Sequence, residues 1–250
     1  VKENRGIEAV KNLSLEVRAG EILGIAGIDG NGQSELIQAL TGLRKVESGH
    51  IYLGGDEITN LRQRKITEAG VGHVPEDRHK YGLILEMTLA ENIALQTYYQ
   101  EPMSQMGVLN YGEINDHACD LIKEFDVRTV SEVVPAKALS GGNQQKAIIG
   151  DPELLIVANP TRGLDVGAIE FIHKRIIEQR DNFKAVLLVS FELEEILNVS
   201  DRIAVLHDGE IVGIVNANET SEQELGLLMA GSSLEKARQE LEQQGVAENE

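Results

Sequence analysis

Residues 21–34 spell Glu-Ile-Leu-Gly-Ile-Ala-Gly-Ile-Asp-Gly-Asn-Gly-Gln-Ser, and they carry the strongest indication of the fold. The apolar run at 21–26 predicts a short buried strand, and the glycines that follow predict a tight loop. Apolar residues from Ser34 to Leu40 then recur with helical spacing. A strand, a glycine-rich loop and a helix in this order predict a phosphate-binding loop, because backbone N–H groups and a helix N-terminus attract an anion.

The loop departs from the G-x-x-x-x-G-K-[ST] pattern at the position of its lysine. Gln33 stands there, and Asp29 adds a negative charge nearby. Glutamine offers hydrogen bonds to phosphate but no positive charge, so we expect weak ATP binding or none. A glycine-rich turn in an ordinary α/β fold remains an alternative for this loop alone. Ser34 is the one candidate Mg²⁺ ligand, and the candidate phosphate-binding residues are Gly27, Asp29, Gly30, Asn31, Gly32, Gln33 and Ser34.

The rest of the chain predicts a parallel α/β core with an inserted helical lobe. Apolar strands at 154–157 and 185–189 flank a helical pattern at 167–180, and strand, helix, strand is the order of a parallel sheet. Asp208-Gly209 between two apolar runs predicts a β-hairpin. Residues 88–125 are mostly helical in pattern. Further strands are expected at 13–17, 50–53, 203–206 and 211–215.

Composition limits the classes of function. The chain has 250 residues and a net charge of −18, which argues against a nucleic-acid surface, because phosphate backbones need Lys and Arg. No apolar run approaches the roughly 20 residues that cross a bilayer. The single cysteine, Cys119, excludes an intramolecular disulfide and suits a reducing cytosol. There is no signal-peptide pattern at the start. The sequence opens on Val1 without Met, so we expect a piece of a longer chain.

Residues 139–146, Leu-Ser-Gly-Gly-Asn-Gln-Gln-Lys, resemble the LSGGQ-type signature motif of ABC ATPases. A serine hydroxyl and glycine N–H groups at a helix N-terminus can bind a γ-phosphate. In that family the motif acts in trans, on nucleotide held by the facing domain. The resemblance therefore assigns Ser140, Gly141, Gly142 and Asn143 to the ATP site of a partner domain.

The motifs for the chain's own site are altered. Residues 154–161, Leu-Leu-Ile-Val-Ala-Asn-Pro-Thr, are similar to the Walker B strand of the family, with Ala158 in place of the Mg²⁺-organising aspartate. Asn159 replaces the glutamate that polarises water, and Phe191 replaces the switch histidine. No aromatic residue precedes Tyr52 to stack on adenine. Phosphoryl transfer needs positioning and charge neutralisation, so the resemblance implies a domain that is catalytically inactive by itself, within an ABC-type ATPase.

Two loops extend the resemblance. Residues 74–78, Val-Pro-Glu-Asp-Arg, resemble the Q-loop, with Glu76 in place of glutamine, and this loop usually touches the transmembrane subunit. Residues 162–165, Arg-Gly-Leu-Asp, are similar to the D-loop, which makes Asp165 a candidate nucleotide-site residue. The resemblance runs from about Gly6 to Ala230 and is greatest to the second, degenerate ATP-binding domain of tandem-domain sugar and nucleoside importers.

The chain departs from the family in length after the signature. It is about one and a half helical turns shorter there, near Gly150-Asp151. We expect a stretch of the natural chain to be missing from the sequence at this point, because a real deletion would distort the signature helix.

We therefore expect an α/β fold with a RecA-like P-loop core and parallel sheet, an antiparallel β subdomain and a helical lobe. Residues 1–75 and 150–230 would form the core, 76–149 the lobe with the signature, and 231–250 a charged C-terminal tail. The implied partners are a competent ATP-binding domain in the same longer chain and the permease subunits of an importer, at the cytoplasmic face of the cell membrane.

Two other functions stay open from the sequence. The first is a structural or regulatory dimerisation module that binds no nucleotide. The second is an ABC-fold protein acting on ribosomes or DNA, against which the acidic surface and the Glu76 region argue.

Overall fold

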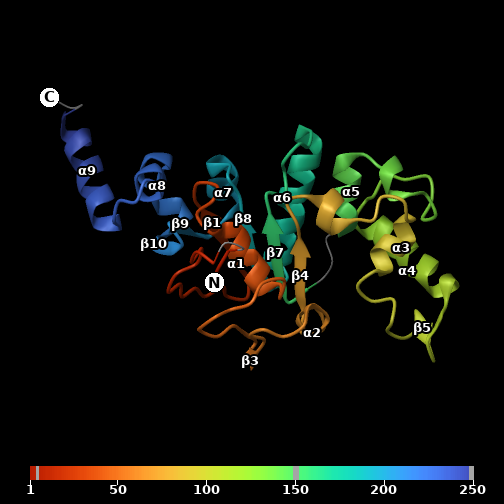
Figure 1. Cartoon of the computed structure of the whole chain (residues 1–250). Coiled ribbons are helices and arrows are strands. Elements are labelled where there is room, and N and C mark those ends of the chain that lie inside the picture. The colour runs from red at the N-terminus through yellow and green to blue at the C-terminus, as the bar shows by residue number, and fades with distance from the viewer. Residues whose placement is uncertain (4–5, 149–151, 248–250) are drawn as a thin grey trace. The chain divides into compact units, whose positions relative to one another are not determined.

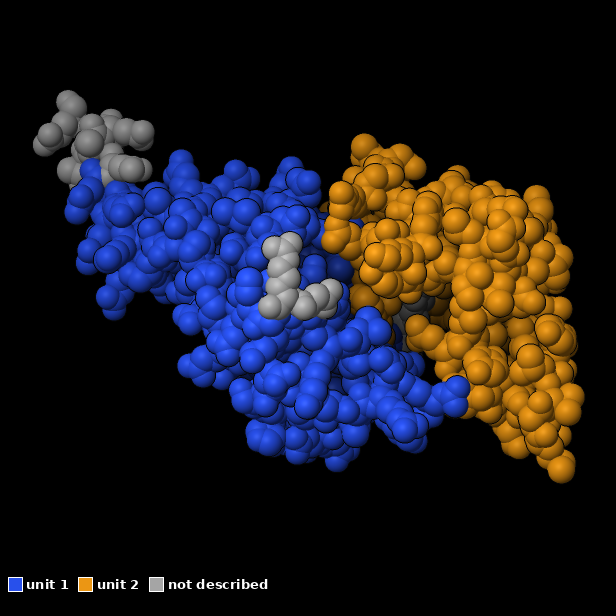
Figure 2. Space-filling view, in the orientation of Figure 1, with its two compact units in different colours: residues 1–71, 152–159, 176–250 blue, residues 72–151, 160–175 orange. Residues whose placement is uncertain are grey.

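The computed structural model describes residues 1–3, 6–148 and 152–247, and the expected break near Gly150-Asp151 lies outside these ranges. Contacts divide the chain into two compact units, coloured separately in Figure 2. Unit 1 comprises residues 1–71, 152–159 and 176–250, and unit 2 comprises residues 72–151 and 160–175.

A six-stranded sheet in the order β10-β9-β1-β8-β7-β4 organises the fold (Figure 1). Strands β1, β7, β8 and β9 are parallel, and β10 is antiparallel to β9. Every residue of β1 and β8 is buried, which explains their continuous apolar runs. The bounds are β1 Glu21–Ala26, β4 Val71–Val74, β7 Leu154–Ala158, β8 Ala185–Val189, β9 Arg202–His207 and β10 Glu210–Asn216.

The helices of unit 1 cover this sheet. Helix α7 (Leu193–Val199) packs on β1, and α8 (Glu222–Met229) packs on β9 and on α9 (Leu234–Ala247). The remaining elements are α1 (Gln33–Leu40), α2 (Gln63–Glu68), the short antiparallel pair β2 (Tyr52–Leu53) and β3 (Asp56–Glu57), η3 (Ala217–Glu219) and the second half of α6 (Val166–Asp181). Their shared core is Leu23, Ile25, Ile37, Ile58, Ile66, Val71, Ile156, Ala158, Leu187, Val189, Ala204 and Leu206.

Unit 2 is mainly helical. Helix α3 (Leu89–Ala94) begins in a capping box formed by Thr88 and Glu91, and it packs on α4 (Tyr111–Glu124). The unit also holds η1 (Arg78–Gly82), η2 (Ala136–Ala138), α5 (Gly141–Ile148) and the first half of α6. Its core consists of Ala90, Ala94, Met103, Ile114 and Ala118.

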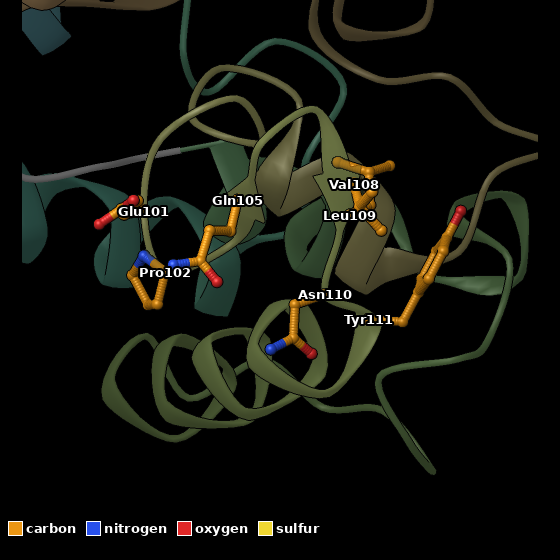
Figure 3. Close-up of a pocket in the computed structure, with 7 residues that line it drawn as sticks. All are labelled: Glu101, Pro102, Gln105, Val108, Leu109, Asn110 and Tyr111. Atoms are coloured by element: carbon orange, nitrogen blue, oxygen red, sulfur yellow. The ribbon is translucent and has the colours of Figure 1, made fainter.

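A small hairpin of β5 (Ser104–Gln105) and β6 (Val108–Leu109) interrupts this helical unit. It borders a cavity of about 500 Å³ (Figure 3). Met106 at the turn is 99% exposed, and Val108 is 72% exposed. The sequence predicts no role for these residues, and their only signal is a few apolar side chains in a polar segment. The cavity is lined by Glu101, Pro102, Gln105, Val108, Leu109, Asn110 and Tyr111.

Most predicted elements are confirmed, one predicted strand is absent and another is shorter than predicted. Residues 13–17 are not a strand: Leu13, Leu15 and Val17 pack on the core in alternation, but the segment has no ladder partner in the described residues. Alternation reports which side chains are buried and not whether the backbone is paired. The strand expected at 50–53 is shortened to Tyr52–Leu53, and the predicted hairpin at Asp208-Gly209 is confirmed, with both residues at positive φ.

Candidate functional site

Three parallel strands of unit 1 end at the same edge of the sheet, where the candidate residues of the chain's own site lie. Ile25 of β1 and Ala158 of β7 are both in register with Val189 of β8. The phosphate loop (residues 27–34) follows β1, Asn159 follows β7 and Phe191 follows β8. The carboxyl edge of a parallel sheet is where ligands of such folds bind.

The phosphate loop is fixed by its neighbours in unit 1. Asn31 accepts hydrogen bonds from the N–H groups of the β9–β10 turn: Gly209 reaches its carbonyl at 3.0 Å, and Asp208 reaches its side-chain oxygen at 3.1 Å. Gly32 has φ +106°, and a Cβ there would lie 2.3 Å from the carbonyl oxygen of Ala9. The loop shape therefore requires glycine at this position for both conformation and space.

Lys11, which lies beside the β9–β10 turn that contacts the phosphate loop, is paired with a carboxylate. Lys11 Nζ lies 2.9 Å from Asp208 Oδ2. This hydrogen bond raises the pKa of Lys11 and lowers the pKa of Asp208. Lys11 therefore serves the turn that holds the loop, and its charge is balanced there.

Gln33 fills the inside of the loop. Its side chain is buried, and its Nε2 donates to the carbonyl of Ile28 at 3.1 Å. A Cβ on Gly27 would lie 2.5 Å from the same Nε2, so the amide lies directly against the start of the loop. Ser34 and Asp29 are exposed. Gln33 thus supports the loop from within and contributes no charge to its surface.

The end of β7 carries no carboxylate. Ala158 is buried, and Asn159 has φ +42°, a conformation that asparagine tolerates. The Asn159 N–H donates to the Val189 carbonyl at 2.7 Å, and its Oδ1 accepts from the Phe191 N–H at 3.0 Å. Asn159 therefore ties β7 to the loop after β8.

These groups fit one part of a nucleotide site and not another. The exposed loop at the N-terminus of α1 can offer backbone N–H groups to phosphate. No cluster of three or more His, Cys, Asp or Glu side chains that could hold a metal occurs within the described ranges. Neither Ala158 nor Asn159, at the end of β7, has a carboxylate that could serve as a Mg²⁺ ligand.

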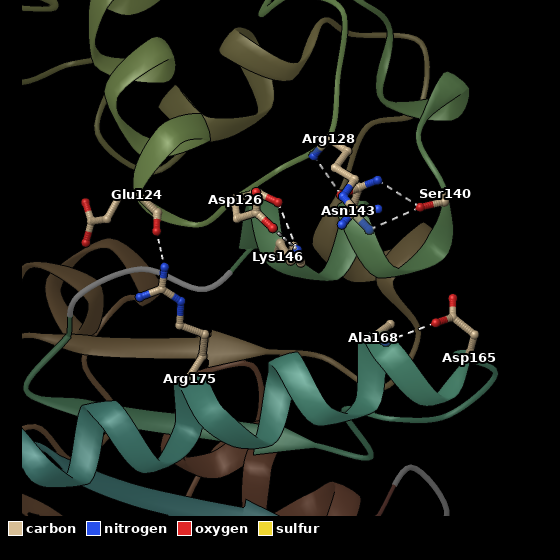
Figure 4. Close-up of polar contacts among 9 residues, drawn as sticks. All are labelled: Glu124, Asp126, Arg128, Ser140, Asn143, Lys146, Asp165, Ala168 and Arg175. Atoms are coloured by element: carbon tan, nitrogen blue, oxygen red, sulfur yellow. Dashed lines mark hydrogen bonds and ion pairs between the residues drawn. The ribbon is translucent and has the colours of Figure 1, made fainter.

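In unit 2, the signature segment (residues 139–146) begins helix α5 with Ser140 as its cap (Figure 4). The Asn143 N–H and side-chain Nδ2 lie 3.4 and 3.0 Å from Ser140 Oγ, and Asn143 Oδ1 accepts from the Arg128 N–H at 2.8 Å. Ser140 is exposed, and its Oγ accepts the hydrogen bonds from Asn143. The hydroxyl hydrogen can therefore point to solvent.

Two buried side chains fix the rest of the segment. Gln144 Nε2 donates to the Ala136 carbonyl at 3.0 Å. Lys146 Nζ donates to the Asp126 carbonyl at 2.8 Å and lies 3.6 Å from the centre of the Phe171 ring. The signature helix is consequently anchored at both its start and its middle.

The D-loop residues lie against the signature glycines within unit 2. Cβ atoms built on Gly141 and Gly142 would lie 3.4 Å from Leu164 Cδ2 and 2.8 Å from Ala168 Cβ. Asp165 is exposed and caps α6 by accepting from the Ala168 N–H at 3.0 Å (Figure 4). Small residues at 141 and 142 allow this close approach.

Glu76 forms an ion pair with Arg162, a partner that the sequence motifs do not predict. The Q-loop segment (residues 74–78) and the first residue of the D-loop (residues 162–165) are therefore joined by a salt bridge within unit 2. A pairing of residues 86 positions apart leaves no signal in a single sequence.

Comparisons with known proteins agree with this geometry. The family model described as ABC transporter matches residues 10–162. The chain is 66% identical over 239 residues to the nucleoside import ATP-binding protein NupA of Lactococcus lactis, covering 94% of this chain and 47% of that protein. It is 64% identical over 242 residues to the guanosine import ATP-binding protein NupO of Bacillus subtilis, covering 95% and 48%. The chain thus spans about half the length of these curated relatives.

A solved dimeric bacterial ABC transporter cassette superposes with a TM-score of 0.70 at 24% identity, over 84% of this chain and 90% of that one. At this identity the likeness shows the fold alone. A transmembrane span needs about 20 apolar residues, and no helix within the described residues meets that requirement.

Proposed function

This chain belongs to the ABC transporter family, and from that premise we propose that it is a degenerate ATP-binding domain of an importer for nucleosides or sugars. It lends its signature segment to the ATP site of a partner domain and hydrolyses little or no ATP at its own. The two relatives above, named for nucleoside and guanosine import, support the substrate class.

The observation that carries the proposal is the contrast between the two sets of motifs. Ser140 is exposed at the start of a well-anchored helix, so its hydroxyl can meet a phosphate. Gln33 and Asn159, which replace the lysine and the glutamate of an active site, are both hydrogen-bonded to their own backbone surroundings. Positioning without charge can hold nucleotide weakly, and it cannot support phosphoryl transfer.

The partner in this proposal is a competent ATP-binding domain in the same longer chain, which agrees with the half-length coverage of the relatives. Residues 1–75 and 150–230 serve as the ATP-binding core and residues 76–149 as the lobe that presents the signature. The loop at Glu76 couples closure of the pair to permease subunits at the cytoplasmic face of the membrane. The Glu76–Arg162 ion pair gives that loop a direct link to the segment ahead of Asp165.

The test is Ser140→Ala in the full-length protein with its permease, measured as ATP hydrolysis and uptake of a labelled nucleoside. The matched control is Ser221→Ala, because Ser221 also caps an eight-residue helix, with its side chain accepting from the Glu224 N–H at 3.2 Å. Both variants lose one cap, which costs about 1 kcal/mol. We expect only Ser140→Ala to lower turnover and uptake, and equal activity of the two variants would exclude the trans role.

Calorimetry of the chain with ATP, with and without Mg²⁺, tests its own site. Weak binding that does not respond to Mg²⁺ is expected, since the described residues hold no carboxylate at the end of β7. Tight Mg²⁺-dependent binding would contradict the degenerate site. Absence of binding, combined with an inert Ser140→Ala, would favour the structural dimerisation module instead.

A further inference from the structure

A guanidinium group lies beside the signature glycines of unit 2. Arg78 is the last residue of the Q-loop segment (residues 74–78) and the first residue of η1. A Cβ built on Gly141 would lie 2.7 Å from its Nη2 and 3.4 Å from its Cζ. The terminal part of the Arg78 side chain therefore lies against the second residue of the Ser140–Gly141–Gly142 turn.

The orientation of this guanidinium is set by Gln144. Arg78 Nε donates to Gln144 Oε1 at 3.2 Å, and His79 Nε2 meets the same oxygen at 2.9 Å. Gln144 Nε2 donates to the Ala136 carbonyl, which fixes which end of the amide faces Arg78. Because Nε donates to Gln144, the N–H groups of the two terminal nitrogens, Nη1 and Nη2, can donate to another acceptor.

No carboxylate among the described residues forms a salt bridge with Arg78. Within the same residues, Gln144 is the only hydrogen-bond partner of the Arg78 side chain. The chain has 41 acidic and 23 basic residues, so most of its cations could find a carboxylate. A guanidinium that has no carboxylate partner among the described residues, and that lies beside the turn at Ser140, can bind an external anion. Ser140 and Asn143 are neutral, and Lys146 of the signature segment is buried and paired with Asp126.

We propose that Arg78 is a phosphate-binding residue of the signature site, acting in trans with Ser140 on the terminal phosphate of the facing nucleotide. This inference rests on the proposed function. A guanidinium forms strong, paired hydrogen bonds to phosphate oxygens, which neutral hydroxyl and N–H donors do not match. Gly141 is needed for this arrangement, because any side chain at that position would displace the Arg78 guanidinium.

The experiment compares Arg78→Met, Arg78→Lys and His79→Leu in the full-length protein with its partner subunits. Arg78→Met removes the charge, Arg78→Lys keeps it, and His79→Leu removes a hydrogen bond to the same Gln144 oxygen while leaving the charge in place. The readouts are kcat/KM for ATP and the inhibition constant for ADP. ADP lacks the terminal phosphate, so a contact to that phosphate affects ATP alone.

We expect Arg78→Met to lower kcat/KM for ATP by about 10- to 100-fold, the usual effect of a charged hydrogen bond. Arg78→Lys should recover a substantial part, His79→Leu should stay near wild type, and the inhibition constant of ADP should not change. An unchanged kcat/KM in Arg78→Met would overturn the inference. A loss that Lys does not recover and His79→Leu reproduces would also overturn it, by showing a purely positioning role.

Comparison with Ser140→Ala distinguishes a failure of the role proposed for Arg78 from a failure of the proposed function. If Ser140→Ala lowers ATP hydrolysis while Arg78→Met does not, the role of Arg78 is wrong and the trans signature stands. If neither variant changes hydrolysis, the proposed function fails as well.

Discussion

His73 should make the protein sensitive to mildly acidic pH. The residue lies in β4, and its Nε2 is buried without a hydrogen-bond partner among the described residues. Burial lowers its pKa from 6.5 to about 4, because a charged imidazolium loses its hydration there. Lowering the pH from 7.5 to 5.0 protonates the ring in the unfolded chain while the folded ring stays largely neutral.

The sign and size of the effect follow from linkage. The pKa of His73 is lower in the folded state than in the unfolded state. The contribution of neutral His73 to the free energy of unfolding is therefore fully present above pH 6.5. It is lost as the pH falls through 6.5, and the loss is complete below about pH 4. At pH 5.0 the unfolded state gains RT ln(1 + 10^1.5) and the folded state only RT ln(1 + 10^−1), which leaves about 2 kcal/mol of destabilisation. At pH 7.5 the same expression is close to zero.

The assay is urea unfolding of the wild type and of His73→Gln at pH 7.5 and 5.0. Glutamine does not titrate, so the difference between the two pH effects isolates His73 from the carboxylates common to both proteins. A matched control is His50→Gln, because the side chain of His50 is 64% exposed. We expect the variant at 73 to lose about 2 kcal/mol less than the wild type between the two pH values. Equal pH dependence of wild type and His73→Gln would refute the reasoning.

Two further predictions concern the phosphate loop. Gly32→Ala should lower the free energy of unfolding by about 3 kcal/mol, from its positive φ and the 2.3 Å approach of a Cβ to the Ala9 carbonyl. Gly30→Ala, with φ +89° in open space, should cost only about 1 kcal/mol, and urea unfolding with similar losses would contradict this account. Gln33→Lys should raise ATP affinity about tenfold in calorimetry by adding a charged donor. Phosphate release should stay at background because Asn159 is still not a carboxylate, and measurable turnover would show that another group activates water.

The sequence predicts the fold well where burial and backbone pairing coincide. The bounds of β1 and β8 match the predicted runs at 21–26 and 185–189, because central parallel strands must be apolar throughout. Residues 13–17 show the limit, since their alternation describes burial alone. The β5–β6 hairpin was missed because two-residue strands carry no periodicity.

For the candidate site, the sequence identifies residues but not their partners. It places Gln33 and Asn159 at the positions of a lysine and a glutamate, yet the bonds to Ile28 and Phe191 depend on loop conformation. The Glu76–Arg162 pair and the contact of Arg78 with Gly141 join segments more than 60 residues apart. A single chain gives no local pattern for such contacts, which arise only when unit 2 folds.

Those partners change how the altered motifs should be interpreted. If Gln33 and Asn159 only lacked the functional groups that they replace, restoring the lysine or the glutamate alone would restore ATP hydrolysis. Instead Gln33 occupies the interior of the loop, and Asn159 supports the segment at Phe191, so each has become part of the local structure. A single reversion removes one of these supports as it adds a charge. The proposed function therefore predicts that neither single reversion restores ATP hydrolysis, while the Arg78 guanidinium lies beside Gly141 of the signature segment.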